Sequence, residues 1–415
     1  MFPLFFIYDR ICMVIFMNKK SKLIFLISLF IVGCEKVEDP ILLSHIVPGD
    51  FIDDEFVFPM NTITTLRMYY KSQYEQVVNE FDNIVISLSK EVDRYHDYEQ
   101  INNLKTINDS CGSDTFINVS DELFELIKLS IDITKLSEGK FNLAMGNIID
   151  LYSSKISEEL SGREDTLFEQ ELINQYVANI PSYEIIDEVI ELDYENKAVK
   201  LNKYNENNVI ISLGAIAKGF VMQKAYDYLK EFNYPALFDA GSSTMATIGQ
   251  KPSDNPSWGI AFSAPVLQGS EQLTTISLSD DNFISTSGDN QQYFKYKDEN
   301  NNTRLMHHII DPYTGISNNY LRSATLFSKD AHLDLLDSLS TILFNCHDDE
   351  EALGIIDLFE NTFNCDISFI LTKPYIENNV VSYEYFDLVV SSSFVAIRNS
   401  DYNERVKKYI VLENY

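Results

Sequence analysis

The segment that most restricts how this chain can fold is NVIISLGAIAKGFVMQKAYDYLKEF, residues 208–232. An apolar run at its start predicts a strand, and apolar residues at helical spacing after the glycines predict a helix that follows almost directly. Short strands and helices recur along the chain, but no Gly-x-Gly-x-x-Gly sequence follows a strand. A Rossmann dinucleotide site is therefore not supported.

Three other segments have clear periodicity. Helices are expected at residues 74–95 and from Val119 onward, where Ser120 is a helix-start signal. Residues 189–202 alternate between apolar and polar side chains around a turn, which predicts a β-hairpin.

Composition narrows the class of protein. The chain has 415 residues, 45% of them hydrophobic and 13% aromatic, so we expect a folded protein despite the formal net charge of -31. With 63 acidic and 32 basic residues, the sequence has no Lys/Arg-rich stripe. The composition therefore argues against non-specific binding to nucleic acid or to an anionic membrane surface, because affinity for phosphate rests on basic clusters.

The amino terminus has the pattern of an export signal. After Met17, three lysines precede an apolar run from Leu23 to Val32, which is too short to span a bilayer. The following Gly33-Cys34 resembles the end of a bacterial lipoprotein signal, in which cleavage leaves a lipidated cysteine that anchors the protein to a membrane surface. The alternative is a plain secretory signal in which Cys34 is incidental.

We therefore predict a signal peptide over residues 1–33, within which Met17 is a candidate translation start. A lipidated Cys34 and a polar tether are predicted over residues 34–58. A folded domain over residues 59–415 would lie on the extracytoplasmic face of a bacterial membrane. Within it, a disulfide between Cys346 and Cys365 is left open, and no Cys/His cluster suggests zinc.

Two patterns are candidate binding sites for phosphate and a cation. In SLGAIAKGF, glycines at the expected start of a helix allow close backbone approach and Lys218 supplies a positive charge, which suits a phosphate or pyrophosphate. In LDSLSTILF, Asp337 and Thr341 lie one helical turn apart, so their oxygens can share a hard cation. Alone, Lys218 also fits an ordinary loop lysine, and Asp337 and Thr341 also fit a pair that hydrogen-bond to each other.

A third pattern is RLMHHIIDPYTG, residues 304–315. The Asp-Pro-x-Thr-Gly sequence predicts a turn, and the residues before it predict a strand. Adjacent side chains of a strand face opposite sides, so only one of His307 and His308 can point into a given site.

Together and in this order, these stretches resemble the FAD:protein FMN transferase family, the ApbE-like flavin transferases. The resemblance covers roughly residues 59–375. It also rests on the stretches PMNTITTLRMY, DRYHDYEQINNLKTIN, KLSEGKFNLAMGNIIDLY, DAGSSTMATIG and ISTSGDNQQYF. It implies one α+β domain of the ApbE-like, T-fold-like type, with mixed or antiparallel sheets flanked by helices. It also implies an enzyme that cleaves FAD, releases AMP and joins FMN to a Thr or Ser hydroxyl of an exported acceptor protein, with Mg2+ as cofactor.

The resemblance assigns roles to individual residues. Asp337 and Thr341 match the metal-binding pair, the main-chain carbonyl of Ala215 matches a third metal ligand, and Lys218 matches a lysine that contacts the flavin nucleotide. His308 matches the histidine of the family's His-x-x-Asp-Pro-x-Thr-Gly signature, so His308 and Asp337 are the expected catalytic residues. Further positions expected to bind the dinucleotide are Met60, Tyr95, Ser287, Gly288 and Asp289.

The chain also departs from the family pattern. Several carboxylates that family members have near the nucleotide are absent here. The residues at these places are Ser212, Gln223, Gly241-Ser242-Ser243 and Phe141-Asn142-Leu143-Ala144. The chain contains no Asp-Gly-x-Thr-Ser/Thr-x-Thr acceptor motif, so we expect it to modify another protein, which carries a threonine in such a motif. Two alternatives remain open: a pyrophosphatase that releases FMN and AMP, and a lipoprotein that binds flavin without catalysis.

Overall fold

A computed structural model describes most of the chain. The described residues are 4–8, 11–17, 24–29, 40–52, 55–72, 74–160, 170–267, 271–297, 303–377 and 380–413. They belong to two compact units, residues 1–41 and residues 42–415. No helix among the described residues has the length and apolar character needed to cross a membrane.

The first unit is a three-stranded antiparallel sheet in the order β1-β2-β3. Its strands are β1 (Leu4–Tyr8), β2 (Ile11–Met17) and β3 (Ile24–Leu29). Gly33 and Cys34, on which the predicted lipidation rests, lie outside the described residues.

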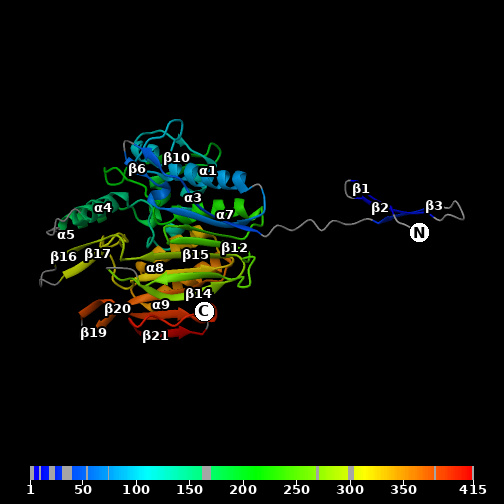
Figure 1. The fold of residues 1–415 in the computed structure, drawn as a ribbon. Helices are drawn as coiled ribbons and strands as arrows, with labels where there is room; N and C mark the ends of the chain where they lie inside the picture. Colours follow the sequence, from blue (N-terminus) through cyan, green and yellow to red (C-terminus); the bar gives the residue numbers. More distant parts are fainter. Residues whose placement is uncertain are drawn as a thin grey trace. The chain divides into compact units, whose positions relative to one another are not determined.

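The second unit is built on a nine-stranded sheet (Figure 1). In sheet order its strands are β21 (Val406–Leu412), β20 (Val380–Ser391), β19 (Ser368–Glu377), β18 (Ser323–Ser328), β15 (Asn282–Gly288), β12 (Thr244–Ile248), β11 (Ala236–Ala240), β7 (Thr64–Tyr70) and β4 (Ile41–Ile46). Neighbouring strands from β7 to β20 pair antiparallel, whereas β21 pairs parallel with β20. This mixed sheet with helices confirms the predicted α+β fold.

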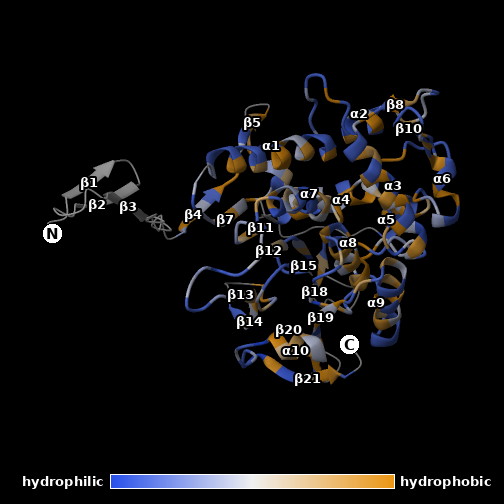
Figure 2. Cartoon of the chain, turned by 90° about the vertical axis from the view of Figure 1, so that its right-hand side faces the viewer, coloured by the Kyte–Doolittle hydropathy of each residue, from blue (hydrophilic) through white to orange (hydrophobic). Residues whose placement is uncertain are grey.

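Helices cover one face of this sheet. They are α1 (Tyr74–Val92), α3 (Asp121–Leu136), α7 (Ala217–Lys230) and α8 (Leu333–Phe344), which share a buried apolar core with the sheet. Hydrophobic residues lie where helices and sheet meet (Figure 2). The helices predicted at residues 74–95 and after Ser120 are confirmed, and the Ser120 hydroxyl accepts the Leu123 N–H at 3.1 Å.

A second apolar core lies on the opposite face of the sheet. There β13 (Trp258–Ser263) pairs with β14 (Gln272–Leu278), and α10 (Ser392–Ile397) packs beside them. A third core joins α4 (Gly146–Leu160) and α5 (Gln170–Val177) to the hairpin of β16 (Tyr293–Lys297) and β17 (Thr303–His307).

Smaller elements complete the second unit. They are β5 (Asp50–Ile52), β6 (Glu55–Val57), η1 (Pro59–Asn61), α2 (Leu104–Asp109), β8 (Ile117–Asn118), η2 (Tyr183–Ile185), α6 (Ile186–Val189), β9 (Ile190–Asp193), β10 (Ala198–Leu201) and α9 (Asp349–Phe363). Strands β9 and β10 form the predicted hairpin. Cys111, Cys346 and Cys365 are free thiols.

Three local expectations differ from the structure. Residues 208–214 form no strand, because their backbone bonds to loops and to a side chain instead: the Asn108 amide bonds both the N–H and the carbonyl of Ile211. The strand expected over residues 304–310 ends at His307. From Leu42 onward, the segment expected to be a tether contains most of edge strand β4 and the β5–β6 hairpin, and these residues belong to the second unit.

The contact between α7 and α8 depends on a glycine. A Cβ atom built on Gly219 would lie 2.3 Å from the Leu333 carbonyl oxygen and 2.6 Å from the Asp334 Cα. These are backbone atoms of α8, so a side chain at this position would force the helices apart. Gly219 therefore sets how closely α7 approaches α8.

We predict that Gly219→Ala lowers the free energy of unfolding by about 1–3 kcal/mol, the usual result of overpacking a core. The matched control is Gly354→Ala in α9, where a Cβ meets nothing within 4 Å and alanine should be neutral or stabilising. Urea unfolding of both variants tests this. Equal stabilities of the two variants would contradict the role of Gly219.

Candidate functional site

A cavity of about 850 Å3 lies where the start of α7, α8 and the end of β15 meet. It brings together residues from distant parts of the sequence. The predicted site residues on its wall are Met60, Tyr95, Ala215, Lys218, Ser287, Gly288, His308, Asp337 and Thr341.

Asp337 supplies a buried carboxylate to the cavity from α8. Its Oδ2 accepts the Gly219 N–H at 2.9 Å and its Oδ1 accepts the Ser285 hydroxyl at 3.3 Å. Burial raises the pKa of Asp337, while Lys218 and the Gly219 N–H act in the opposite direction. A bound cation would stabilise this buried charge.

Thr341 lies one turn further along α8. Its hydroxyl donates to the Asp337 main-chain carbonyl at 3.3 Å and lies 3.3 Å from the Ser287 hydroxyl of β15. The alternative from the sequence, a direct bond between the Asp337 and Thr341 side chains, is not among the contacts of the described residues. The two side chains therefore both contribute oxygens to the cavity.

These oxygens fit a hard divalent cation. The Asp337 carboxylate, the Thr341 hydroxyl and the Ala215 segment line the same cavity, and oxygen is the ligand that such cations prefer. The described residues contain no cluster of three or more His, Cys, Asp or Glu side chains suited to a metal. A single carboxylate is the pattern of a Mg2+ site in which substrate phosphates supply further ligands.

The start of α7 provides a site for an anion. Ile216 occupies the N-cap position without a side-chain cap, and Lys218 is the second residue of this 14-residue helix. Both the Lys218 side chain and the partial positive charge of the helix start favour a phosphate. Ser212, one of the departures from the family pattern, lies on the cavity wall nearby, where it contributes no charge.

The two adjacent histidines face different surroundings, as predicted. His307 is 1% exposed, and its Nε2 lies 2.9 Å from the Asn318 carbonyl oxygen. His308 is accessible, and the surface that it exposes belongs to the cavity wall. The structure thus separates a structural histidine from one that faces the candidate site.

The contacts of His308 define its tautomer. Its main-chain N–H donates to the Gln292 carbonyl at 3.0 Å, and its Nδ1 lies 3.3 Å from the same oxygen. Because a carbonyl only accepts, Nδ1 carries the proton and Nε2 of the neutral ring is a base. Desolvation of the ring by the surrounding protein and the positive charge of Lys218 lower the pKa of His308 to about 4, so the ring is neutral at pH 7.

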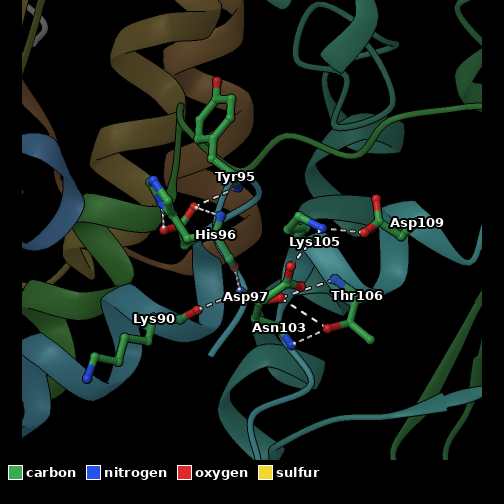
Figure 3. Close-up of polar contacts among 9 residues, drawn as sticks. Lys90, Tyr95, His96, Asp97, Asn103, Lys105, Thr106 and Asp109 are labelled. Atoms are coloured by element: carbon green, nitrogen blue, oxygen red, sulfur yellow. Dashed lines mark hydrogen bonds and ion pairs between the residues drawn. The ribbon is translucent and has the colours of Figure 1, made fainter. Parts of the chain in front are cut away.

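Tyr95 is held on the cavity wall by the turn after α1. Its N–H donates to Asp93 Oδ1 at 2.7 Å, and the Asp93 carboxylate also bonds His96. Asn103 bonds the carbonyls of Lys90 and His96, while the phenol ring of Tyr95 points away from these contacts (Figure 3). This turn therefore fixes the backbone, while the Tyr95 side chain lies on the cavity wall, where its hydroxyl accepts a hydrogen bond from Arg94 Nη2 at 2.7 Å.

Met60 lies at a strained corner of the cavity wall. Both Met60 and Asn61 have positive φ, 55° and 53°. For methionine this conformation is unusual, and such strain often occurs at binding sites.

The structure does not place Asp289 on the cavity wall. The residue is 1% exposed and forms a buried ion pair with Arg322, to which its Oδ2 is bonded. Asp289 was expected to bind the dinucleotide together with Ser287 and Gly288, but its carboxylate is bonded to Arg322 and does not line the cavity.

Sequence reasoning also missed part of the wall. Arg94 lies beside Tyr95, with its guanidinium 4.6 Å from the ring centroid, and bonds Asp150 at 2.6 Å. Lys140 enters from the loop after α3 and pairs with Glu351 at 2.6 Å. Both residues lie in stretches that carry the family resemblance, so closer attention to basic residues there would have found them.

The chain resembles known proteins in family, in sequence and in fold. The family model described as ApbE family matches residues 60–363. A FAD:protein FMN transferase from Klebsiella pneumoniae is 26% identical over 68% of this chain and 83% of its own length. The corresponding Vibrio cholerae protein is 25% identical over 72% of this chain and 80% of its own length.

Solved structures share the fold. The ApbE protein of Thermotoga maritima has a TM-score of 0.61 and 20% identity, over 86% of this chain and 100% of that chain. The flavin transferase ApbE of Vibrio cholerae gives the same TM-score of 0.61 at 20% identity, over 86% of this chain and 99% of that chain.

We predict that His307 makes stability depend on pH. Burial lowers the pKa of His307 to about 3 from its ordinary 6.5, so between these values the unfolded chain binds a proton that the folded protein does not. The free energy of unfolding should therefore fall as pH falls below 6.5, by about 2 kcal/mol at pH 5. The variant His307→Gln removes this pH-dependent contribution to the free energy of unfolding. Urea unfolding at pH 7 and pH 5 should show a smaller pH effect in the variant, and equal effects would refute the assignment.

Proposed function

The chain belongs to the ApbE family, and from this membership and the cavity we propose that it is a FAD:protein FMN transferase. In this reaction the hydroxyl oxygen of a threonine or serine attacks the phosphorus on the FMN side of the FAD pyrophosphate. A new P–O bond forms, the P–O bond to AMP breaks, and AMP leaves. The curated relatives that carry this name support the proposal.

One observation carries the proposal. Residues suited to a cation, to a phosphate and to proton transfer line one cavity: Asp337 with Thr341, Lys218, and His308. Lone aspartates, lysines and histidines are common, but phosphoryl transfer needs these three functions around one pyrophosphate.

The cation site is proposed to hold Mg2+ through Asp337, Thr341 and the Ala215 carbonyl. When bound, Mg2+ supplies charge neutralisation at the pyrophosphate as its P–O bond breaks. Lys218 and the start of α7 bind phosphate oxygens and orient the FAD. Tyr95 and Met60, on the same wall, contact the rest of the dinucleotide.

His308 is the proposed general base. With the Nδ1 proton bonded to Gln292, its Nε2 accepts the proton of the attacking hydroxyl. The lowered pKa of His308 keeps this nitrogen unprotonated at neutral pH. Asp337 holds the cation, and its bond to the Gly219 N–H fixes the carboxylate in place.

We also propose that the protein acts at the extracytoplasmic face of a bacterial membrane, anchored through lipid on Cys34. The support is the sequence of residues 17–34. The acceptor would then be another exported protein, with a threonine in a flavinylation motif.

We predict that the protein, incubated with FAD, Mg2+ and an acceptor peptide, yields a peptide heavier by one FMN in mass spectrometry. The variant Asp337→Asn should lower kcat by at least 100-fold, because the charge that holds the cation is lost. Asp334→Asn is the matched control: Asp334 is also buried in α8, but it does not line the large cavity. Equal losses in both variants would contradict the proposed role of Asp337.

The same assay separates transfer from hydrolysis. A transferase releases AMP mainly when the acceptor is present, whereas a pyrophosphatase releases FMN and AMP at the same rate without it. Tight FAD binding with no AMP release in either case would identify a flavin-binding protein without catalysis.

For the lipid anchor, we predict that Cys34→Ser produced in a bacterium leaves the membrane fraction, while the parent protein stays in it. Cys111→Ser is the control, because this cysteine lies far beyond the signal. Mass spectrometry of the amino-terminal peptide should show added acyl groups in the parent only. Membrane association of both variants would contradict a Cys34 anchor.

A further inference from the structure

A buried arginine–aspartate pair lies behind the cavity wall. The side chains of Arg322 and Asp289 are each 2% exposed, and Arg322 Nε donates to Asp289 Oδ2. Burying two charges costs solvation free energy that their attraction offsets only when the remaining polar atoms are also bonded. Here Asp289 Oδ1 and Arg322 Nη1 have no partner among the described residues. A contribution to the stability of the folded protein therefore does not explain why this pair is present.

Arg322 joins several segments around this pair. Its Nη2 donates to the Pro265 carbonyl at 2.7 Å, and its guanidinium lies 5.0 Å from the Tyr383 ring centroid and 5.6 Å from that of Phe386. Its own carbonyl accepts the Asp289 N–H at 3.1 Å. The turn that begins at Asp289 is thus bonded to the first residue before β18 by both backbone and side chain.

This turn leads directly to the proposed base. Asn290, Gln291 and Gln292 follow Asp289 and line the cavity, and the Gln292 carbonyl accepts both bonds from His308. Asn290 adds a bond to the Val266 carbonyl at 3.2 Å, next to the Pro265 that Arg322 holds. The Gln292 oxygen thus lies between two restraints: the contacts of Asp289 and Arg322 precede it, and the β16–β17 ladder begins after it at the Tyr293–His307 pair.

We propose that Asp289 and Arg322 are positioning residues that hold the 289–292 turn, so that the Gln292 carbonyl fixes the ring orientation and tautomer of His308. Neither side chain lines the cavity, and both act through the turn. The effect on catalysis rests on the proposed function. The effect on the His308 ring does not, because it exists without substrate.

The test replaces the pair by apolar residues of similar size, Asp289→Leu with Arg322→Met, a change that buried ion pairs often tolerate. The 15N shifts of the His308 ring, assigned with His308→Gln, report the tautomer in the absence of FAD. We expect the Nδ1–H form in the parent protein and a mixture with the Nε2–H form in the double variant. In the transfer assay kcat should fall about 10- to 100-fold with a smaller change in the KM for FAD, as for a misplaced catalytic group.

Two further variants keep the test decisive. Asp289→Asn retains an oxygen that accepts from Arg322 Nε, so His308 should keep the parent tautomer. Arg322→Lys loses the planar guanidinium group, so the parent tautomer should be lost. Arg322→Lys also serves if the double variant does not fold. The control is Arg405→Met with Glu271→Leu, an arginine–carboxylate pair with Nε–O distance 2.6 Å whose side chains do not line the cavity.

An unchanged His308 tautomer, either in the folded Asp289→Leu/Arg322→Met double variant or in Arg322→Lys, would overturn the proposal. If the parent protein transfers no FMN but the tautomer changes as expected, the proposed function fails and the positioning role stands. A fall in kcat equal to that of the Arg405 and Glu271 control would show a general structural effect and would also overturn the proposal.

Discussion

The close contact of α7 with α8 at Gly219 is the constraint on which the rest of the site depends. The absent side chain lets the backbone of α7 approach α8, and the Gly219 N–H then reaches the Asp337 carboxylate at 2.9 Å. One residue earlier, Lys218 faces the same cavity. A single close approach of two helices thus places an anion-binding helix start beside a buried carboxylate, which neither helix provides alone.

Three other predicted residues of the wall, Met60, Tyr95 and His308, lie in a short 3-10 helix or in turns rather than in the main helices and strands. Met60 lies in a corner with positive φ, Tyr95 in a turn held by Asp93, and His308 just past the end of β17. The backbone of each segment is held by hydrogen bonds, from Asn61 to the Phe58 carbonyl, from Tyr95 to Asp93 and from His308 to the Gln292 carbonyl. The sheet and helices supply rigidity, and the turns at their ends supply chemical variety.

Periodic segments were predictable from the sequence, whereas positions set by tertiary contacts were not. The helices α1, α3 and α8 and the β9–β10 hairpin follow from local patterns. Residues 208–214 have the composition of a strand, but their hydrogen-bonding groups are taken by Asn108 and by loops. Asp289 was expected to bind the dinucleotide, yet its side chain pairs with Arg322, 33 residues away. Local spacing singled out Lys218, Asp337 and Thr341 but left alternatives open, and only the family resemblance added Met60, Tyr95, Ser287 and Gly288, which also line the cavity.

The cavity has walls from the segment just before β7 and from strands as late as β19. No continuous part of the second unit contains a complete wall, so a partly folded chain has no competent binding site. A molecule that binds this cavity and not the unfolded chain stabilises the folded state by RT ln(1 + L/Kd), where L is its free concentration. Its occupancy thus reports on the integrity of the unit from the segment before β7 to β19, and links the lifetime of the folded protein to the supply of its ligand.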